Sequence, residues 1–161
     1  HGAHFLLSTI DQAHEEMRAV SYNLMPKSLE KLGLAQAIEG AVSRLRRSHP
    51  AVNWHFYSNF QNGHLDELTK INLFRIAQEM LHNVLQHAQA TEAHLQLLRQ
   101  GDRIVLSMED NGVGFPVKTH TLRTGIGLSN IRYRAEDVLK GKLTIESNPG
   151  KGTFLAVEVP V

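Results

Sequence analysis

The sequence predicts a two-layer α/β sandwich, in which a mixed β-sheet has helices packed on one of its faces. Two helical patterns come first, and the order strand–helix–strand–strand–helix–strand–strand follows them. The strands of each adjacent pair, 93–99 with 103–109 and 142–147 with 154–159, are joined too tightly for a parallel crossover. Each pair is therefore expected to be antiparallel, with the helices on one face of the sheet. The 161 residues suffice for one domain with a full core.

The first part of the chain has two helical patterns and a strand. Residues 4–25 carry apolar side chains at helical spacing, and Pro26 ends this pattern. A second helix is expected from Gly33 to residues 49–50. Residues 52–57 are rich in aromatic side chains and are expected to form the first strand.

The helix expected at residues 69–88 divides most clearly into two faces. Its apolar face carries Leu73, Ala77, Met80, Leu81, Val84 and Ala88. Its polar face carries Arg75, Glu79, Asn83, Gln86 and His87. After the first hairpin, an irregular stretch with glycines leads to a helix expected at residues 126–139 and then to the closing hairpin.

Composition excludes several classes of function. The net charge of +1 gives no electrostatic case for binding nucleic acid or a membrane surface. Without cysteines, the chain has neither disulfides nor a thiolate metal site. His82 and His87 have no second set of ligands for a transition metal and are interpreted as site-lining or structural. The chain begins His-Gly-Ala without an initiator Met, so we expect it to be a fragment of a longer protein.

Three short motifs could carry chemistry, and each also has a plain structural explanation. Glu79, Asn83 and His87 are four residues apart, so a carboxylate and a carboxamide share one helical stripe that suits a magnesium nucleotide. The alternative is a solvated polar face. Asp110 opens an Asp-Asn-Gly-Val-Gly-Phe run after a strand, where its carboxylate could accept a hydrogen bond from an exocyclic amine such as that of adenine. The alternative is an ordinary turn.

The third motif is Gly-Ile-Gly-Leu at residues 125–128, at the start of a helix. Backbone N–H groups at a helix N-terminus form a site for anions such as phosphate. The alternative is a junction that only needs flexible residues. A Gly-Lys-Gly-Thr run follows at residues 150–153, between the last two strands.

Taken in order, these motifs resemble the catalytic domain of sensor histidine kinases, in the ATPase superfamily shared with DNA gyrase, heat-shock chaperone ATPases and mismatch-repair MutL proteins. Residues 78–88 resemble the N box, residues 110–115 the first glycine box and residues 125–128 the second. The short loop between the glycine boxes and the linker-like residues 24–34 point to the nitrate-sensor-like subfamily. The resemblance implies the Bergerat-type ATP-binding fold, with ATP and Mg²⁺ as cofactors.

The resemblance also assigns roles by position. Glu79 would act as the general base or orient the acceptor, and Asn83 would ligate Mg²⁺. Asp110 would receive the adenine amine, with Thr153 assisting through water. The other expected nucleotide contacts, beneath a lid at about residues 116–124, are Gln86, His87, Gly112, Gly114, Gly125, Gly127 and Leu128. Gln86 stands where close relatives often have Lys or Arg, which lowers the affinity expected for the nucleotide.

By the same resemblance, residues 1–26 would be the C-terminal helix of a dimerisation and phosphoacceptor region, and residues 27–161 the catalytic domain. The γ-phosphoryl group would pass to a histidine outside the fragment, because His14 lies on the later of the two family helices. The expected partners are the phosphoacceptor helix of the same or a paired protomer and a response regulator. The parent would be a homodimer with this domain in the cytoplasm. The alternatives are an anti-sigma-factor type serine kinase, a gyrase- or chaperone-like ATPase, and a non-catalytic nucleotide-binding scaffold.

Overall fold

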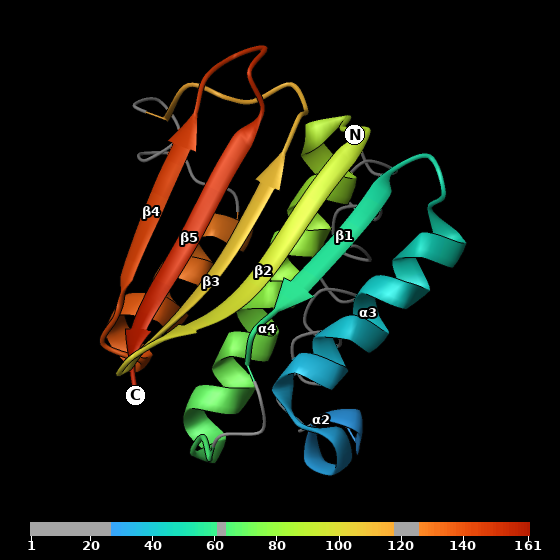
Figure 1. The fold of residues 1–161 in the computed structure, drawn as a ribbon. Coiled ribbons are helices and arrows are strands. Elements are labelled where there is room, and N and C mark those ends of the chain that lie inside the picture. Colours follow the sequence, from blue (N-terminus) through green and yellow to red (C-terminus); the bar gives the residue numbers. More distant parts are fainter. Residues whose placement is uncertain (1–26, 61–63, 118–125) are drawn as a thin grey trace, which may run out of the picture.

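A computed structural model describes residues 27–60, 64–117 and 126–161, excluding the side chains of Ser28, His87, Ala88 and Ile126 (Figure 1). The helix expected at residues 4–25 and its assignment to a dimerisation region lie outside these ranges. A five-stranded mixed sheet has the order β1-β2-β3-β5-β4. The strands are β1 (Asn53–Ser58), β2 (Glu92–Gln100), β3 (Arg103–Asp110), β4 (Lys142–Ser147) and β5 (Thr153–Pro160).

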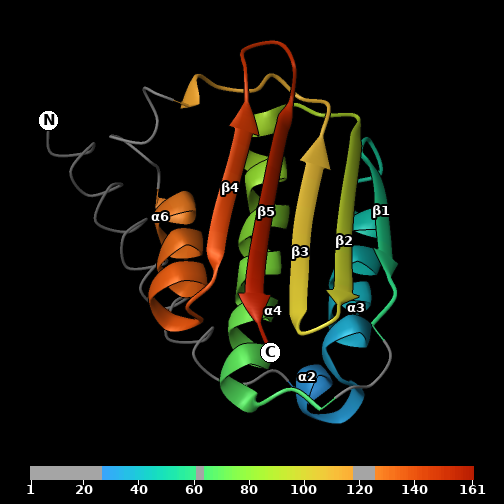
Figure 2. The same cartoon turned by 60° about the vertical axis from the view of Figure 1, so that its left-hand side comes forward.

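Only the β1–β2 pair is parallel among the described strand pairs, and the other three are antiparallel. The chain between β1 and β2 crosses over through a long helix, as a parallel connection requires. The described helices cover one face of the sheet, and the other face is open (Figures 1 and 2). The two-layer sandwich predicted from the sequence is therefore confirmed.

The helical layer has three regions, which follow one another from the β1 edge of the sheet to the β4 edge. Under β1 and β2 lie α2 (Lys27–Leu32) and α3 (Leu34–Ser48). The central helix α4 (Glu67–Asn83) continues into the π-helical turn η1 (Val84–Ala88). On the β4 side lie α6 (Ile126–Arg132) and the π-helical turn η2 (Tyr133–Val138).

Alternation along the strands builds the core between the layers. In β3, Ile104, Leu106 and Met108 are buried while their neighbours are more accessible, so one face of the strand points at the helices. The equivalent buried positions are Ala93, Leu95 and Leu97 in β2, and Leu155, Val157 and Val159 in β5. They meet the buried side chains Leu73, Phe74, Ile76, Ala77 and Met80 of α4.

The structure differs from the prediction in its helices. The short helix α2 was not predicted, because six residues ended by Gly33 at φ 88° give little periodic signal. The helices expected at residues 69–88 and 126–139 each begin as α-helix and end as a π-helical turn. A π-turn has more residues per turn than an α-helix, so the four-residue spacing used to place His87 in the polar stripe does not hold there.

Candidate nucleotide-binding site

The centre of the site is the contact between α4 and the start of α6. Asp66 caps the N-terminus of α4, its Oδ1 accepting the backbone N–H of Thr69 at 2.7 Å. Near the other end of this helix, the half-buried side chains of Glu79 and Asn83 reach toward α6. A Cβ atom added to Gly127 would lie 2.8 Å from Asn83 Oδ1 and 3.2 Å from Glu79 Oε2. Gly127, from the Gly-Ile-Gly-Leu motif, therefore lies beside Glu79 and Asn83, and the roles expected of these residues stay predictions.

Arg75, which the sequence placed on the polar face of this helix, is buried, and this corrects the expectation of a solvated side chain there. Its side chain is 4% exposed, its Nη1 donates to Gln78 Oε1 at 2.7 Å, and its guanidinium carbon lies 5.7 Å from the centre of the Phe74 ring. The helix at this point is covered on most sides, because residues 72–77 are all buried. The aliphatic stem of an arginine can pack in such a place when its head group has partners.

Arg134 is a cation of the site region that sequence reasoning missed. It lies in η2, and its Nη1 donates to Asn72 Oδ1 of α4 at 2.8 Å. Burial lowers the pKa of Arg134, and the nearby carboxylate of Glu79 opposes this shift. Glu79 and Arg134 are 55 positions apart in the chain, so no spacing signal could have paired them.

Asp110 ends β3 and is 9% exposed. Its Oδ1 accepts the backbone N–H of Gly112 at 2.8 Å. Burial raises the pKa of Asp110, and the N–H groups of Gly112 and Thr153 partly offset this effect. An ionised carboxylate has about four acceptor positions, so Asp110 can still receive a further donor. This agrees with the buried acceptor expected from the sequence.

Asn111 has a structural role within the first glycine box. Its Oδ1 accepts the N–H groups of Thr91 and Glu92, each at 2.9 Å, and its Nδ2 donates to Thr91 Oγ1 at 2.9 Å. These bonds tie the end of β3 to the start of β2. They keep Asp110 in a fixed position at this edge of the fold.

Two glycines allow the first glycine box to approach the β4–β5 turn closely. Gly114 has φ +65°, and a Cβ there would lie 2.0 Å from the Asn148 carbonyl oxygen. Gly152 has φ +75°, and a Cβ there would lie 2.1 Å from the Asp110 carbonyl oxygen. Neither position can take a larger residue without moving backbone. The glycines thus bring Thr153 beside Asp110, its partner in the β3–β5 register.

Ser147 was also missed by sequence reasoning, and it connects these two segments. Its buried hydroxyl donates to the Gly152 carbonyl at 3.0 Å and accepts the Phe115 N–H at 2.9 Å. It also lies 2.9 Å from the Thr153 hydroxyl. Since Ser147 has one hydroxyl hydrogen, Thr153 must be the donor of that bond, which leaves its lone pairs available to a water or an amine.

The remaining expected site residues lie near this centre to different degrees. Gln86 is exposed on η1, and Leu128 is half-buried in α6, where it packs against the core. Gly112 is buried and supplies the N–H that Asp110 accepts. Gly125, residues 118–124 of the expected lid and the side chain of His87 lie outside the described residues.

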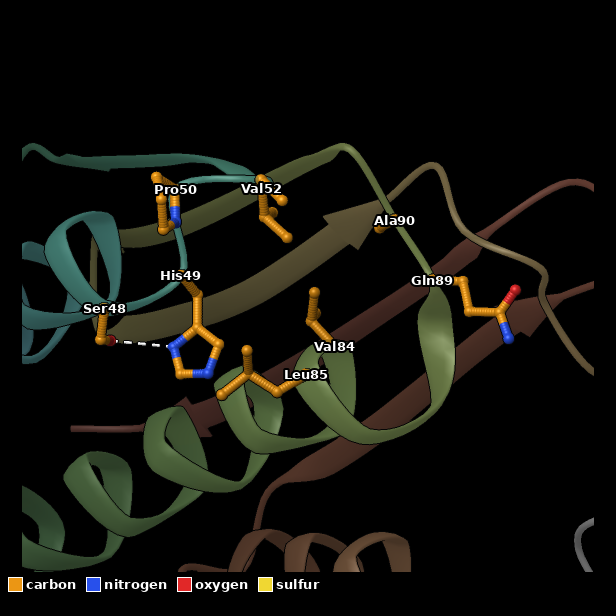
Figure 3. A pocket seen from close by; sticks show the side chains of 9 residues that line it. Ser48, His49, Pro50, Val52, Val84, Leu85, Gln89 and Ala90 are labelled. Carbon is orange, nitrogen blue, oxygen red and sulfur yellow. Dashed lines mark hydrogen bonds between the residues drawn. The ribbon is translucent and has the colours of Figure 1, made fainter.

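A cavity of about 410 Å³ opens elsewhere, between the end of α3 and η1 (Figure 3). Val84, Leu85 and Val52 give it an apolar lining, and the His49 ring stands beside it with Nδ1 2.8 Å from Ser48 Oγ. None of the residues expected to bind the nucleotide lines it. This cavity is therefore separate from the contact between α4 and α6.

Curated relatives of this chain are sensor kinases. It is 29% identical over 147 residues to the oxygen sensor histidine kinase NreB of Staphylococcus carnosus, covering 91% of this chain and 42% of that protein. It is 35% identical to the sensor histidine kinase ComP of Bacillus subtilis, covering 88% of this chain and 18% of that protein. The corresponding values for the kinase/phosphatase UhpB of Salmonella typhimurium are 33%, 91% and 28%. The chain thus spans less than half the length of these relatives.

Solved structures agree on the fold. A histidine kinase domain from Erythrobacter litoralis EL346 superposes with a TM-score of 0.65 at 21% identity, covering 79% of this chain and 60% of that one. The Acinetobacter baumannii histidine kinase AdeS gives a TM-score of 0.67 at 14% identity, covering 96% of this chain and 79% of that one.

In the described ranges, no helix has both the length and the apolarity needed to cross a membrane.

The family model for histidine kinase-, DNA gyrase B- and HSP90-like ATPases matches residues 69–161, more than half of the chain. The match begins in α4 and includes β3, α6 and the β4–β5 turn, the elements that meet at the candidate site. The relatives named above are histidine kinases. The chain therefore belongs to the histidine kinase-, DNA gyrase B- and HSP90-like ATPase family, as an ATP-binding domain of the sensor histidine kinase type that its motifs predicted.

Proposed function

We propose that this domain holds Mg-ATP between α4, the end of β3 and the start of α6, and transfers the γ-phosphoryl group to a histidine on another segment. One observation carries the proposal. Gly127 lies against Glu79 and Asn83, so the glycine-bearing start of α6 meets a carboxylate and a carboxamide. The absence of a side chain at Gly127 leaves the backbone there open to a phosphate beside these two oxygen donors.

Asp110 would select adenine. Its carboxylate is held by the N–H of Gly112 and can accept the exocyclic amine of the base. Thr153 keeps hydroxyl lone pairs free beside it and can accept from a bridging water. A hydrogen bond to a buried, ionised acceptor discriminates well between bases, because a wrong base would leave the carboxylate unpaired.

Glu79 and Asn83 would serve the phosphate end. Both offer oxygen atoms to the same small region beside Gly127, and hard oxygen donors are the ligands that Mg²⁺ prefers. Asn83 Oδ1 would hold the ion, which neutralises phosphate charge when bound. The backbone at Gly127 and Leu128 would lie along the phosphates, and glycine leaves room for that approach.

The transfer itself would need little covalent chemistry from the protein. A ring nitrogen of the acceptor histidine attacks the γ-phosphorus in line, the bond to the β,γ-bridging oxygen breaks, and ADP leaves. Glu79 would orient the imidazole or take its N–H proton. The half-buried guanidinium of Arg134 would keep the charge of Glu79 balanced.

In the whole protein, the acceptor histidine would come from a helix of the same or a paired protomer. A response regulator would then receive the phosphoryl group. These assignments rest on the relatives named above, of which this chain matches only a part. We expect this chain to bind ATP without phosphorylating itself.

Nucleotide titrations with and without Mg²⁺ test the binding step. Asp110→Ala is expected to abolish ATP binding, and Asn83→Ala to remove the difference that Mg²⁺ makes. Glu67→Gln, an exposed carboxylate in the first turn of the same helix, is the matched control and should change neither. Unchanged ATP affinity in Asp110→Ala would exclude the proposed adenine site.

Labelling of a supplied acceptor domain with γ-labelled ATP tests the transfer step. Glu79→Gln should lower the labelling rate while ATP still binds, because the amide can neither take a proton nor carry charge. A domain that binds ATP but labels no acceptor helix from any close relative would instead be a nucleotide-binding scaffold.

A further inference from the structure

Two histidines and a glutamate meet on the open face of the sheet, opposite the helices. His55 of β1 and His94 of β2 are paired positions of the parallel ladder, and Glu92 lies two residues before His94 on the same face of β2. The two imidazole rings stack, with 4.3 Å between centroids and 6° between planes. All three side chains are accessible to solvent.

Their ligand atoms form a compact set. Nε2 of His55 lies 2.8 Å and Nε2 of His94 3.9 Å from the same carboxylate oxygen, Glu92 Oε2. One possible ligand atom from each of the three residues lies within 4.8 Å of the other two. Two atoms bound to one zinc ion at about 2.1 Å each are about 3.4 Å apart in a tetrahedral site. Rotations of the accessible rings that move their nitrogens by roughly 1 Å therefore complete the geometry.

The glutamate is oriented by a neighbour. Asn53 Nδ2 donates to Glu92 Oε1 at 2.9 Å, which leaves Oε2 directed to the rings. Glu92 is therefore held by Asn53 on one carboxylate oxygen and faces His55 with the other. An outer partner that fixes a ligating carboxylate is a regular feature of metal sites in proteins.

We propose that His55, Glu92 and His94 bind a divalent transition-metal ion, with Zn²⁺ the ion that best suits the ligands. Two imidazole nitrogens and one carboxylate oxygen are a donor set that zinc accepts, and the remaining position is left to water. The same nitrogens disfavour Mg²⁺, which prefers oxygen. To bind the ion, His55 must give up the 2.8 Å hydrogen bond from its Nε2 to Glu92 Oε2 and carry its proton on Nδ1, which leaves the Nε2 lone pair for the metal.

This site is independent of the nucleotide. It lies on β1 and β2, on the face of the sheet that the described helices leave open, whereas Glu79 and Asn83 lie in the helical layer (Figure 2). Zinc bound there should leave the affinity for ATP unchanged. A failure of the proposed kinase activity would not affect the metal site, and the reverse also holds.

Competition of the chain with a chromophoric chelator for Zn²⁺, near neutral pH, tests the proposal. His94→Ala should weaken the tightest zinc site by about 100-fold, and Asn53→Ala by about 10-fold, the range measured for outer partners of metal ligands. The matched control is His49→Ala, another exposed histidine, whose ring is bonded to Ser48. ATP titration and circular dichroism check that each variant is folded.

A second measurement uses the unaltered chain. Zinc should shift the imidazole resonances of His55 and His94 in an NMR titration, with saturation at one equivalent for these two rings. The proposal is overturned if wild type and His94→Ala bind zinc equally, if His49→Ala loses as much affinity, or if both rings stay unshifted.

Discussion

At the scale of single residues, Asp110, the proposed acceptor for adenine, is a buried carboxylate whose ionisation costs stability. Its pKa in the folded chain is raised above the ordinary value of 3.8, with burial as the largest cause. At pH values below 3.8 this carboxyl does not lower the free energy of unfolding, because it is protonated in both the folded and the unfolded chain. The cost appears as pH rises toward the raised pKa and is complete above it.

Asp110→Asn should therefore separate the two effects. The amide oxygen can keep the N–H of Gly112, so at neutral pH the variant should be more stable than wild type, with a difference that closes as pH falls to 3.8. Its affinity for ATP should fall by about 10- to 100-fold, as for a lost hydrogen bond to a charged group. Urea unfolding across pH and ATP titration measure both. A variant less stable at every pH would contradict this account of Asp110.

Ser147 joins the first glycine box to the β4–β5 turn through one hydroxyl. Ser147→Ala leaves the Phe115 N–H and the Gly152 carbonyl without that partner, so we expect a loss of about 1–3 kcal/mol in unfolding free energy. ATP affinity should fall too, because Thr153 loses its acceptor. Ser43→Ala is the control, since its hydroxyl makes only a 3.4 Å contact with Glu39 and its removal should change stability by less than about 0.5 kcal/mol. Equal losses in the two variants would argue against a special role for Ser147.

At the scale of elements, the approach of α4 to α6 depends on Gly127. An added Cβ would meet only the ends of Asn83 and Glu79, which can rotate away. Gly127→Ala should therefore leave folding intact, or stabilise it by up to about 1 kcal/mol as alanine replaces glycine in a helix. It should weaken Mg-ATP binding by displacing Asn83.

Gly40→Ala is the control for this substitution. Gly40 also lies within a helix, α3, and a Cβ there would meet nothing within 4 Å. It should gain similar stability without any change in ATP affinity. If both glycine variants bind Mg-ATP like wild type, the α4–α6 contact does not hold the phosphates.

The elements also show which parts of the fold the sequence could predict. Strands and the helices α3 and α4 have strong local periodicity, so their positions agreed with expectation. The π-helical turns η1 and η2 were not predicted, because a change in the number of residues per turn leaves no local signal in the sequence. The order of the strands in the sheet was not predicted, because it depends on pairing between strands that are distant in the sequence. Ser147, Arg134 and the His55–His94 pair were missed for the same reason: their partners are remote in sequence.

At the scale of the whole molecule, the candidate site and the far edge of the sheet share one core. The buried helix α4 contacts α3 on one side and α6 on the other, and β1 is linked to β3 through β2. Trp54, the only tryptophan, is 4% exposed in the edge strand β1, and its indole N–H donates to the His49 carbonyl at 3.1 Å. The fluorescence of Trp54 therefore reports the unfolding of the β1 edge, at a distance from the candidate nucleotide site.

If the domain unfolds as one cooperative unit, Mg-ATP should stabilise the β1 edge as much as the site. At 100 times its dissociation constant, the ligand should raise the unfolding free energy by about 2.7 kcal/mol. The urea transition followed by Trp54 fluorescence should shift as far as the one followed by circular dichroism, and neither should shift in Asp110→Ala. A circular dichroism transition that moves without the fluorescence transition would mean that β1 and α3 unfold separately from the nucleotide-binding half, and two-state analysis would then not apply.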